Sequence, residues 1–166
     1  MQPFPHRYAV RLVGGPSGYA ELATAGPPPI AAAPAPQFEG PGDAWSPEHL
    51  LLAAVEACFL FTLRAVARHA KVEFRALQVD ATGIVDRSGG VTRFSEIVLR
   101  PTITVDGRTS RDVVLRLLTK TEHACLVSAS LATPIRIYPD VVRVPDADEP
   151  NSKMNGAPAT EVRPTG

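Results

Sequence analysis

The stretch SPEHLLLAAVEACFLFTLRAVAR, residues 46–68, decides how this chain folds. It opens with three helix start signals in order: a serine suited to the N-cap at Ser46, a proline at the first helical position and an acid, Glu48, in the first turn. Residues 49–70 contain neither proline nor glycine. The run therefore predicts one long helix.

Apolar side chains cover nearly every face of this predicted helix, which is typical of a helix that is buried on all sides. Glu56 and Arg64 interrupt it, so its uncharged stretches are shorter than the ~18 consecutive apolar residues of a membrane span. We therefore expect a central core helix and no membrane association.

Outward from this helix, on both sides of it in the sequence, short segments in which apolar and polar residues alternate predict strands. Residues 7–13 and 19–24 flank a glycine-rich turn and predict a first hairpin. Residues 72–86 and 91–105 flank Ser88-Gly89-Gly90 and predict a second hairpin.

The C-terminal part of the chain predicts one more helix and one more strand. Apolar residues recur at helical spacing from Ser110, a possible cap, to about His123. Residues 135–144 predict a strand that Pro139 interrupts, and proline confines such a strand to a sheet edge. This order of elements predicts an α+β fold in which antiparallel sheets wrap long central apolar helices.

The length of 166 residues fits one domain, which we assign to residues 1–145. Residues 27–42 hold six of the 17 prolines and predict an extended loop without a helix or a central strand. Residues 146–166 are poor in large apolar side chains and predict a disordered tail.

Charge and motifs exclude several function classes. The 17 basic and 17 acidic side chains balance and are scattered, so neither a nucleic acid nor an anionic membrane surface is an expected partner. The sequence contains no nucleophile elbow, dinucleotide fingerprint, phosphate-binding loop, paired-histidine zinc motif or CxxC. The first residues lack a secretory signal pattern, and we expect a cytoplasmic protein.

Two cysteines, Cys58 and Cys125, remain as candidates for chemistry. In a reducing compartment they are free, metal-bound or redox-active rather than a permanent bridge, and each is also compatible with a small buried core residue. Two histidines of the long helix are too far apart for one metal site, and His123 with Cys125 supplies too few ligands. We expect no metal and no cofactor.

The local sequences around both cysteines resemble the OsmC/Ohr family, the osmotically inducible and organic hydroperoxide resistance proteins. The resemblance rests on Pro47-Glu48 at the start of a helix, Ala57-Cys58-Phe59 ten residues later, and Cys125 in an H-x-C-x-V-S setting. It covers about residues 8–144.

The resemblance implies an intertwined α+β homodimer and a thiol peroxidase that reduces organic hydroperoxides with an external dithiol or thiol. By this resemblance Cys58 is the peroxidatic thiol, Cys125 is the resolving thiol, and Glu48 holds an arginine that activates Cys58. Such a cation is needed because an apolar environment disfavours a thiolate. Because Glu48 and Cys58 lie about 15 Å apart along one helix, keeping the family's cluster requires a second chain.

The sequence departs from the family pattern at two points. The family arginine in the turn near the N-terminus has no counterpart in residues 14–22, where Arg7 and Arg11 are the nearest substitutes. Leu126 replaces the proline that usually follows the second cysteine.

Two other functions stay open: a binding module for an acyl or lipid-like molecule with inert cysteines, and a thiol redox sensor.

Overall fold

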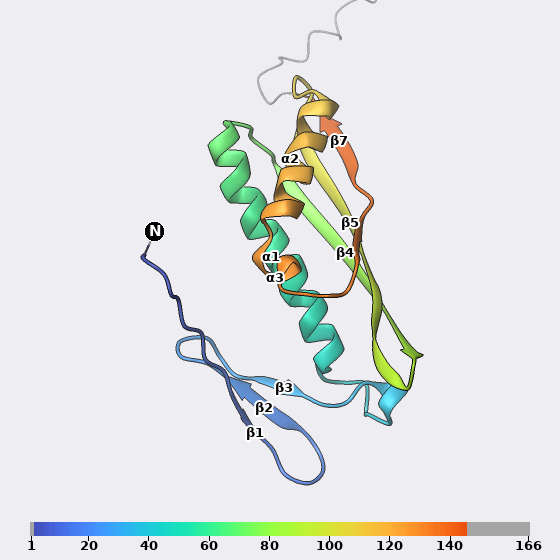
Figure 1. Ribbon diagram of the computed structural model, residues 1–166. Helices are drawn as coiled ribbons and strands as arrows, with labels where there is room; N and C mark the ends of the chain where they lie inside the picture. Colours follow the sequence, from blue (N-terminus) through green and yellow to red (C-terminus); the bar gives the residue numbers. More distant parts are fainter. Residues whose placement is uncertain (1, 146–166) are drawn as a thin grey trace, which may run out of the picture.

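The computed structural model describes residues 2–145 and contains two β-sheets and two long helices (Figure 1). The elements follow in the order β1 (Arg11–Val13), β2 (Ala20–Ala23), β3 (Ile30–Ala32), a 3-10 turn η1 (Pro36–Phe38), α1 (Pro47–Ala70), β4 (Ala76–Ser88), β5 (Val91–Asp106), α2 (Arg111–Ala124), α3 (Leu126–Ala129), β6 (Ile135–Ile137) and β7 (Asp140–Val144). The α+β class is confirmed, and the predicted tail at 146–166 lies outside the described residues.

α1 forms as the start signals predict. Ser46 is its N-cap, and the Ser46 Oγ accepts the backbone N–H of His49 at 3.3 Å. Pro47 occupies the first turn, and the helix runs for 24 residues without a break.

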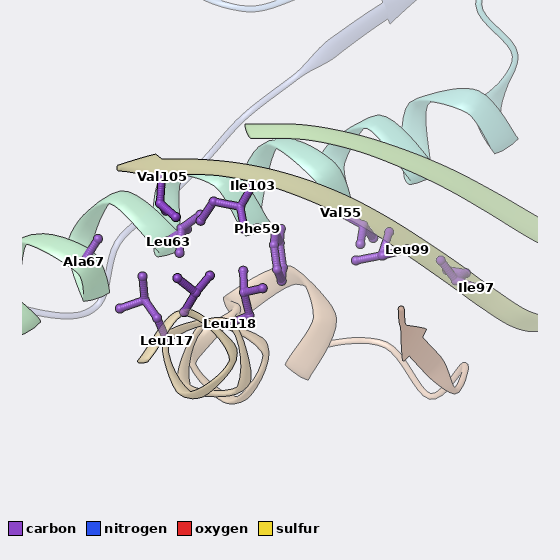
Figure 2. Packing of buried hydrophobic residues seen from close by; sticks show 11 residues of the cluster. Val55, Phe59, Leu63, Ala67, Ile97, Leu99, Ile103, Val105, Leu117 and Leu118 are labelled. Carbon is purple, nitrogen blue, oxygen red and sulfur yellow. The ribbon is translucent and has the colours of Figure 1, made fainter. Parts of the chain in front are cut away.

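The main body is one layer of helices on one face of a four-stranded sheet (Figure 1). β4 and β5 form the long antiparallel hairpin that the sequence predicts. Alternate residues of β5 point toward the helices and are buried. They meet one stripe of α1 and the apolar side of α2 (Figure 2); the cluster is Val55, Phe59, Leu63, Ala67, Ile97, Leu99, Ile103, Val105, Val114, Leu117 and Leu118.

The last predicted strand is two strands, β6 and β7, on either side of the break at Pro139. Both pair in parallel with β5, on the edge opposite β4. The prediction of purely antiparallel sheets is corrected here. α2 and α3 supply the long crossover that a parallel connection requires, so the chain returns to β5 in the same direction.

The N-terminal segment forms a separate antiparallel sheet with the order β1-β2-β3, which lies beyond the first turns of α1 (Figure 1). The predicted first hairpin is present in shorter form. The extended loop without a helix or a central strand that was predicted for residues 27–42 is corrected in part, because they contain the 3-10 turn η1 and a strand, β3, which pairs with β2 at the sheet edge. Proline is tolerated at a sheet edge, and here all the prolines flank the short strand rather than interrupt it.

The expectation that α1 is buried on all sides is also wrong for a single chain. Only Val55, Phe59, Leu63 and Ala67 of this helix are buried, because the sheet and α2 cover it from one side. Phe61, on the uncovered side, is 60% exposed. The N-terminal arm is uncovered as well, with Tyr8 at 88% exposure.

By length and composition α1 is the one helix among residues 2–145 that could cross a membrane. The side chains of Phe59 and Leu63 on this helix pack in the core with no exposed surface, so one side of α1 belongs to the core of this fold.

Candidate functional site

Cys58 lies in the middle of α1, on the flank that faces the turn between α2 and α3. It is half-buried. Its Sγ accepts the backbone N–H of Val127, with an N–Sγ distance of 3.5 Å, and lies 3.9 Å from the Oγ1 of Thr62, one helical turn further along α1. The thiol therefore sits between its own helix and a segment 69 residues away in sequence.

Cys125 is the residue at which α2 ends and α3 begins. Its backbone is extended there, with φ −71° and ψ 109°, and its side chain has no exposed surface. Both cysteines are free, and they are close enough for each thiol to shift the pKa of the other. The structure thus brings together the two cysteines that the sequence singled out.

The two thiols have pKa values shifted in opposite directions. Burial by itself raises the pKa of Cys58, but hydrogen bonds to its sulfur outweigh burial and bring the pKa below its ordinary value. The donors are, in decreasing order of effect, the Val127 N–H, the Cys125 thiol, the Thr62 hydroxyl and the Leu126 N–H.

Burial raises the pKa of Cys125, and hydrogen bonds with Ser128 reduce that effect only in part. The Cys58 sulfur raises the pKa of Cys125 further, because Cys125 donates its proton to it and a second negative charge nearby is unfavourable. Cys58 therefore loses its proton more easily than an ordinary cysteine, and Cys125 loses its proton less easily.

Glu48 lies in the first turn of α1 and lines an apolar pocket of about 370 Å³, together with Leu12, Phe38 and Pro47. Its Oε2 is buried and has no hydrogen-bond partner among the described residues. Ten residues of helix, about 15 Å, separate Glu48 from Cys58. Within one chain the structure does not bring this carboxylate to the thiols.

Arg7 and Arg11 are exposed on the N-terminal arm and on β1. Leu12 lines the pocket that contains Glu48, and neighbouring strand residues point to opposite faces, so Arg11 points away from that pocket. None of the groups that shift the pKa of Cys58 is an arginine. A role for either arginine therefore needs a second chain.

Thr62 and the backbone of residues 126–127 are partners of Cys58 that the sequence analysis missed. Thr62 could have been found, since residues four apart on a helix are neighbours. The two backbone N–H groups leave no signal in the sequence, because nearly every residue has one. Among residues 2–145, no three His, Cys, Asp or Glu side chains are grouped closely enough to hold a metal ion.

Residues 40–139 match the OsmC-like protein family, and this matched region is more than half of the chain. The chain belongs to the OsmC-like family. Both cysteines, Glu48 and the whole of α1 and α2 lie inside the match.

The relatives of this OsmC-like chain include the uncharacterized protein YmaD of Bacillus subtilis, which is 31% identical over 98 residues. That match covers 57% of this chain and 65% of YmaD, so it spans less than two thirds of the relative's length.

Solved structures share the fold at low sequence identity. An OsmC-like protein of unknown function from Vibrio cholerae superposes with a TM-score of 0.75 at 16% identity, over 81% of this chain and 99% of its own. An organic hydroperoxide resistance protein from Legionella pneumophila superposes with a TM-score of 0.66 at 21% identity, and the match covers 83% of this chain and 99% of that protein. An organic hydroperoxide resistance protein from Elizabethkingia anophelis superposes with a TM-score of 0.67 at 21% identity, and the match covers 85% of this chain and 100% of that protein.

Proposed function

We propose that this protein is a cysteine-based thiol peroxidase that reduces organic hydroperoxides. The observation that carries the proposal is the placement of Cys58 against the turn that begins at Cys125, where the Val127 N–H donates to its sulfur, together with the opposite pKa shifts of the two thiols. A peroxidatic thiol must be a thiolate, and its resolving partner must stay reduced until the first step is complete. Two similar structures carry the name of organic hydroperoxide resistance proteins, which agrees with this chemistry.

In the proposed cycle the Cys58 thiolate attacks the distal peroxide oxygen, the O–O bond breaks, and the alkoxide takes a proton and leaves as an alcohol. Cys58 is then a sulfenic acid. The Cys125 thiol attacks its sulfur, a disulfide forms and water leaves. An external dithiol or thiol reduces the disulfide and is itself oxidised.

The proposal includes a symmetric homodimer, the form in which Glu48 of one chain can approach Cys58 of the other. The groups that a second copy would contact are the exposed Arg7 and Arg11 and the buried Glu48 Oε2, which has no hydrogen-bond partner among residues 2–145. In this arrangement Glu48 holds Arg11 or Arg7 near the thiolate. We place the protein in the cytoplasm, where thiols stay reduced between turnovers.

One equivalent of cumene hydroperoxide tests the proposal. We expect the intact mass of the reduced protein to fall by two hydrogens, both thiols to become resistant to alkylation after unfolding, and a dithiol to support repeated turnover. Unchanged mass with both thiols still titratable would overturn the proposal and favour the small-molecule binding module. Oxidation of the two thiols without turnover in the presence of any dithiol would overturn the proposed enzyme activity and favour a thiol redox sensor.

A further inference from the structure

A groove with basic walls lies where the chain turns from the end of α1 toward β4 (Figure 1). Its volume is about 560 Å³. Residues that follow one another by four and three positions share one side of a helix, which gathers the basic side chains here. The residues of the groove that matter below are the basic Arg64, Arg68 and Lys71, the acidic Glu73 and the apolar Phe74.

The positive charge of this groove is not neutralised within the described part of the chain. Cations near a helix C-terminus are favourable in themselves, which accounts for part of the pattern. All three basic side chains are exposed, however, and none of them forms an ion pair with a carboxylate among residues 2–145. Three positive charges against the single negative charge of Glu73 leave the groove positive.

The described part of the chain ends close to this groove. Arg75 directly follows Phe74, and its Nη2 donates to the carbonyl oxygen of Pro145 at 3.3 Å. An ion pair between Arg75 and Asp106 holds the same guanidinium in place. One arginine side chain and one step of backbone therefore separate the wall of the groove from Pro145.

The sequence continues from Pro145 with Asp146-Ala147-Asp148-Glu149, three acids in four residues. At no more than ~3.5 Å per residue, four residues span up to about 14 Å, which is enough for their carboxylates to reach the groove. Residues 146–166 are poor in large apolar side chains, so charge is the main contribution that they can make to binding.

We propose that the acidic segment 146–149 docks in this groove and pairs with Arg64, Arg68 and Lys71. A single exposed ion pair is weak, but attachment at Pro145 gives the acids a high effective concentration beside the cations. The contact is electrostatic and therefore weakens with salt. It is independent of the proposed peroxidase function, because neither cysteine takes part in it.

A zero-length cross-link tests the docking. A water-soluble carbodiimide joins a lysine Nζ to a contacting carboxylate as an amide, and the water that is lost converts the carbodiimide to a urea. We expect peptide mapping by mass spectrometry to find Lys71 joined to an acid of segment 146–149 in protein that remains a single chain on a denaturing gel. Lys120, exposed on α2, should not form this link.

Nearness along the chain alone could join Lys71 to the acids, so the deciding variant is the double substitution Arg64→Gln and Arg68→Gln. It keeps Lys71 and every acid but removes two of the three cations. The yield of the link should fall roughly threefold to fivefold, as the loss of two exposed ion pairs implies. Arg116→Gln, an exposed change on α2, is the matched control and should leave the yield unchanged.

The same link in wild-type protein should form severalfold less in 1 M sodium chloride, where the screening length is about 3 Å. An unchanged yield in the double variant would overturn the inference, as would a link found only between two chains or one of equal yield at Lys120. If the double variant does not fold by circular dichroism, the salt dependence decides. No peroxide is used, so this result is separate from the test of the peroxidase.

Discussion

At the scale of single residues, the two cysteines show how environment assigns different roles to the same side chain. Cys58 is half-buried and accepts the Val127 N–H, whereas Cys125 is fully buried, and burial raises its pKa. The sulfur that accepts hydrogen bonds ionises more easily than the one that donates. In the proposed cycle this difference makes Cys58 the attacking thiol and Cys125 the resolving one.

Cys125→Ser should leave the first oxidation step intact and remove the second. Cys58 would reach sulfenic acid, find no partner thiol, and continue to sulfinic acid in excess peroxide, which intact-mass spectrometry reports as two added oxygens. The rate of the first step should rise with pH through the Cys58 pKa and level off below the pH at which an ordinary cysteine ionises, because that pKa is lowered.

Cys58→Ser is the reciprocal variant, and Cys125 should then stay reduced in stoichiometric peroxide. Burial keeps the Cys125 pKa above its usual value, so the thiol is protonated at neutral pH and reacts slowly. Rapid oxidation of Cys125 in this variant would show that the two roles are reversed.

The sequence identified both cysteines as the candidate site because they are the only two and occupy specific local contexts. It could not identify the Val127 N–H as a partner, because a backbone donor carries no residue-type signal. It also could not place Glu48 and Arg11 relative to Cys58. Strand alternation at Leu12 and the length of α1 separate them within one chain, and only the three-dimensional arrangement shows this.

At the scale of elements, helix capping distinguishes α1 from α2. The Ser46 Oγ accepts a backbone N–H at the start of α1, whereas Ser110, the N-cap of α2, makes no side-chain cap hydrogen bond. Ser46 is also almost fully buried. Both serines fit the sequence rule for an N-cap, and only one of them caps.

Ser46→Ala should lower the free energy of unfolding by about 1 kcal/mol, the usual effect of losing an N-cap hydrogen bond. Ser110→Ala is the matched control and should change the unfolding free energy by less than about 0.5 kcal/mol, as exposed substitutions without a lost contact do. Chemical denaturation of both variants at one protein concentration measures the difference. Equal losses would contradict the assigned capping.

Elements with strong local signals could be predicted from the sequence, and those that depend on distant partners could not. α1 has a cap, a proline at its start and no breaker, and the β4–β5 hairpin has a glycine turn. β3 is three residues long and exists because β2 pairs with it. The parallel pairing of β6 and β7 with β5 depends on the path of the chain over α2, which no local pattern encodes.

At the scale of the whole molecule, large apolar side chains remain exposed. They include Phe61 on the outer side of α1 and Phe4, Tyr8 and Val10 on the N-terminal arm. Apolar surface that is gathered into one patch is a common mark of an interface. A second copy of the chain, as proposed above, would cover it.

Phe61→Glu should dissociate the proposed homodimer, since a charge on the outer side of α1 would have to leave water on association. Light scattering at micromolar concentration should give a dimer for wild type and a smaller species for this variant. Lys120→Glu, an exposed charge change on α2, is the control and should stay dimeric. A monomeric wild-type protein would contradict the proposal directly.

The position of the thiol pair also has a consequence for the connectivity of the chain. A bond between Cys58 and Cys125 would close a covalent ring that contains the rest of α1, the whole β4–β5 hairpin and α2. Cross-linking a loop of this length removes about 4 kcal/mol of loop entropy from the unfolded ensemble. Each turn of the proposed cycle would then alternate the protein between a linear and a cyclised topology, with the cyclised one harder to unfold.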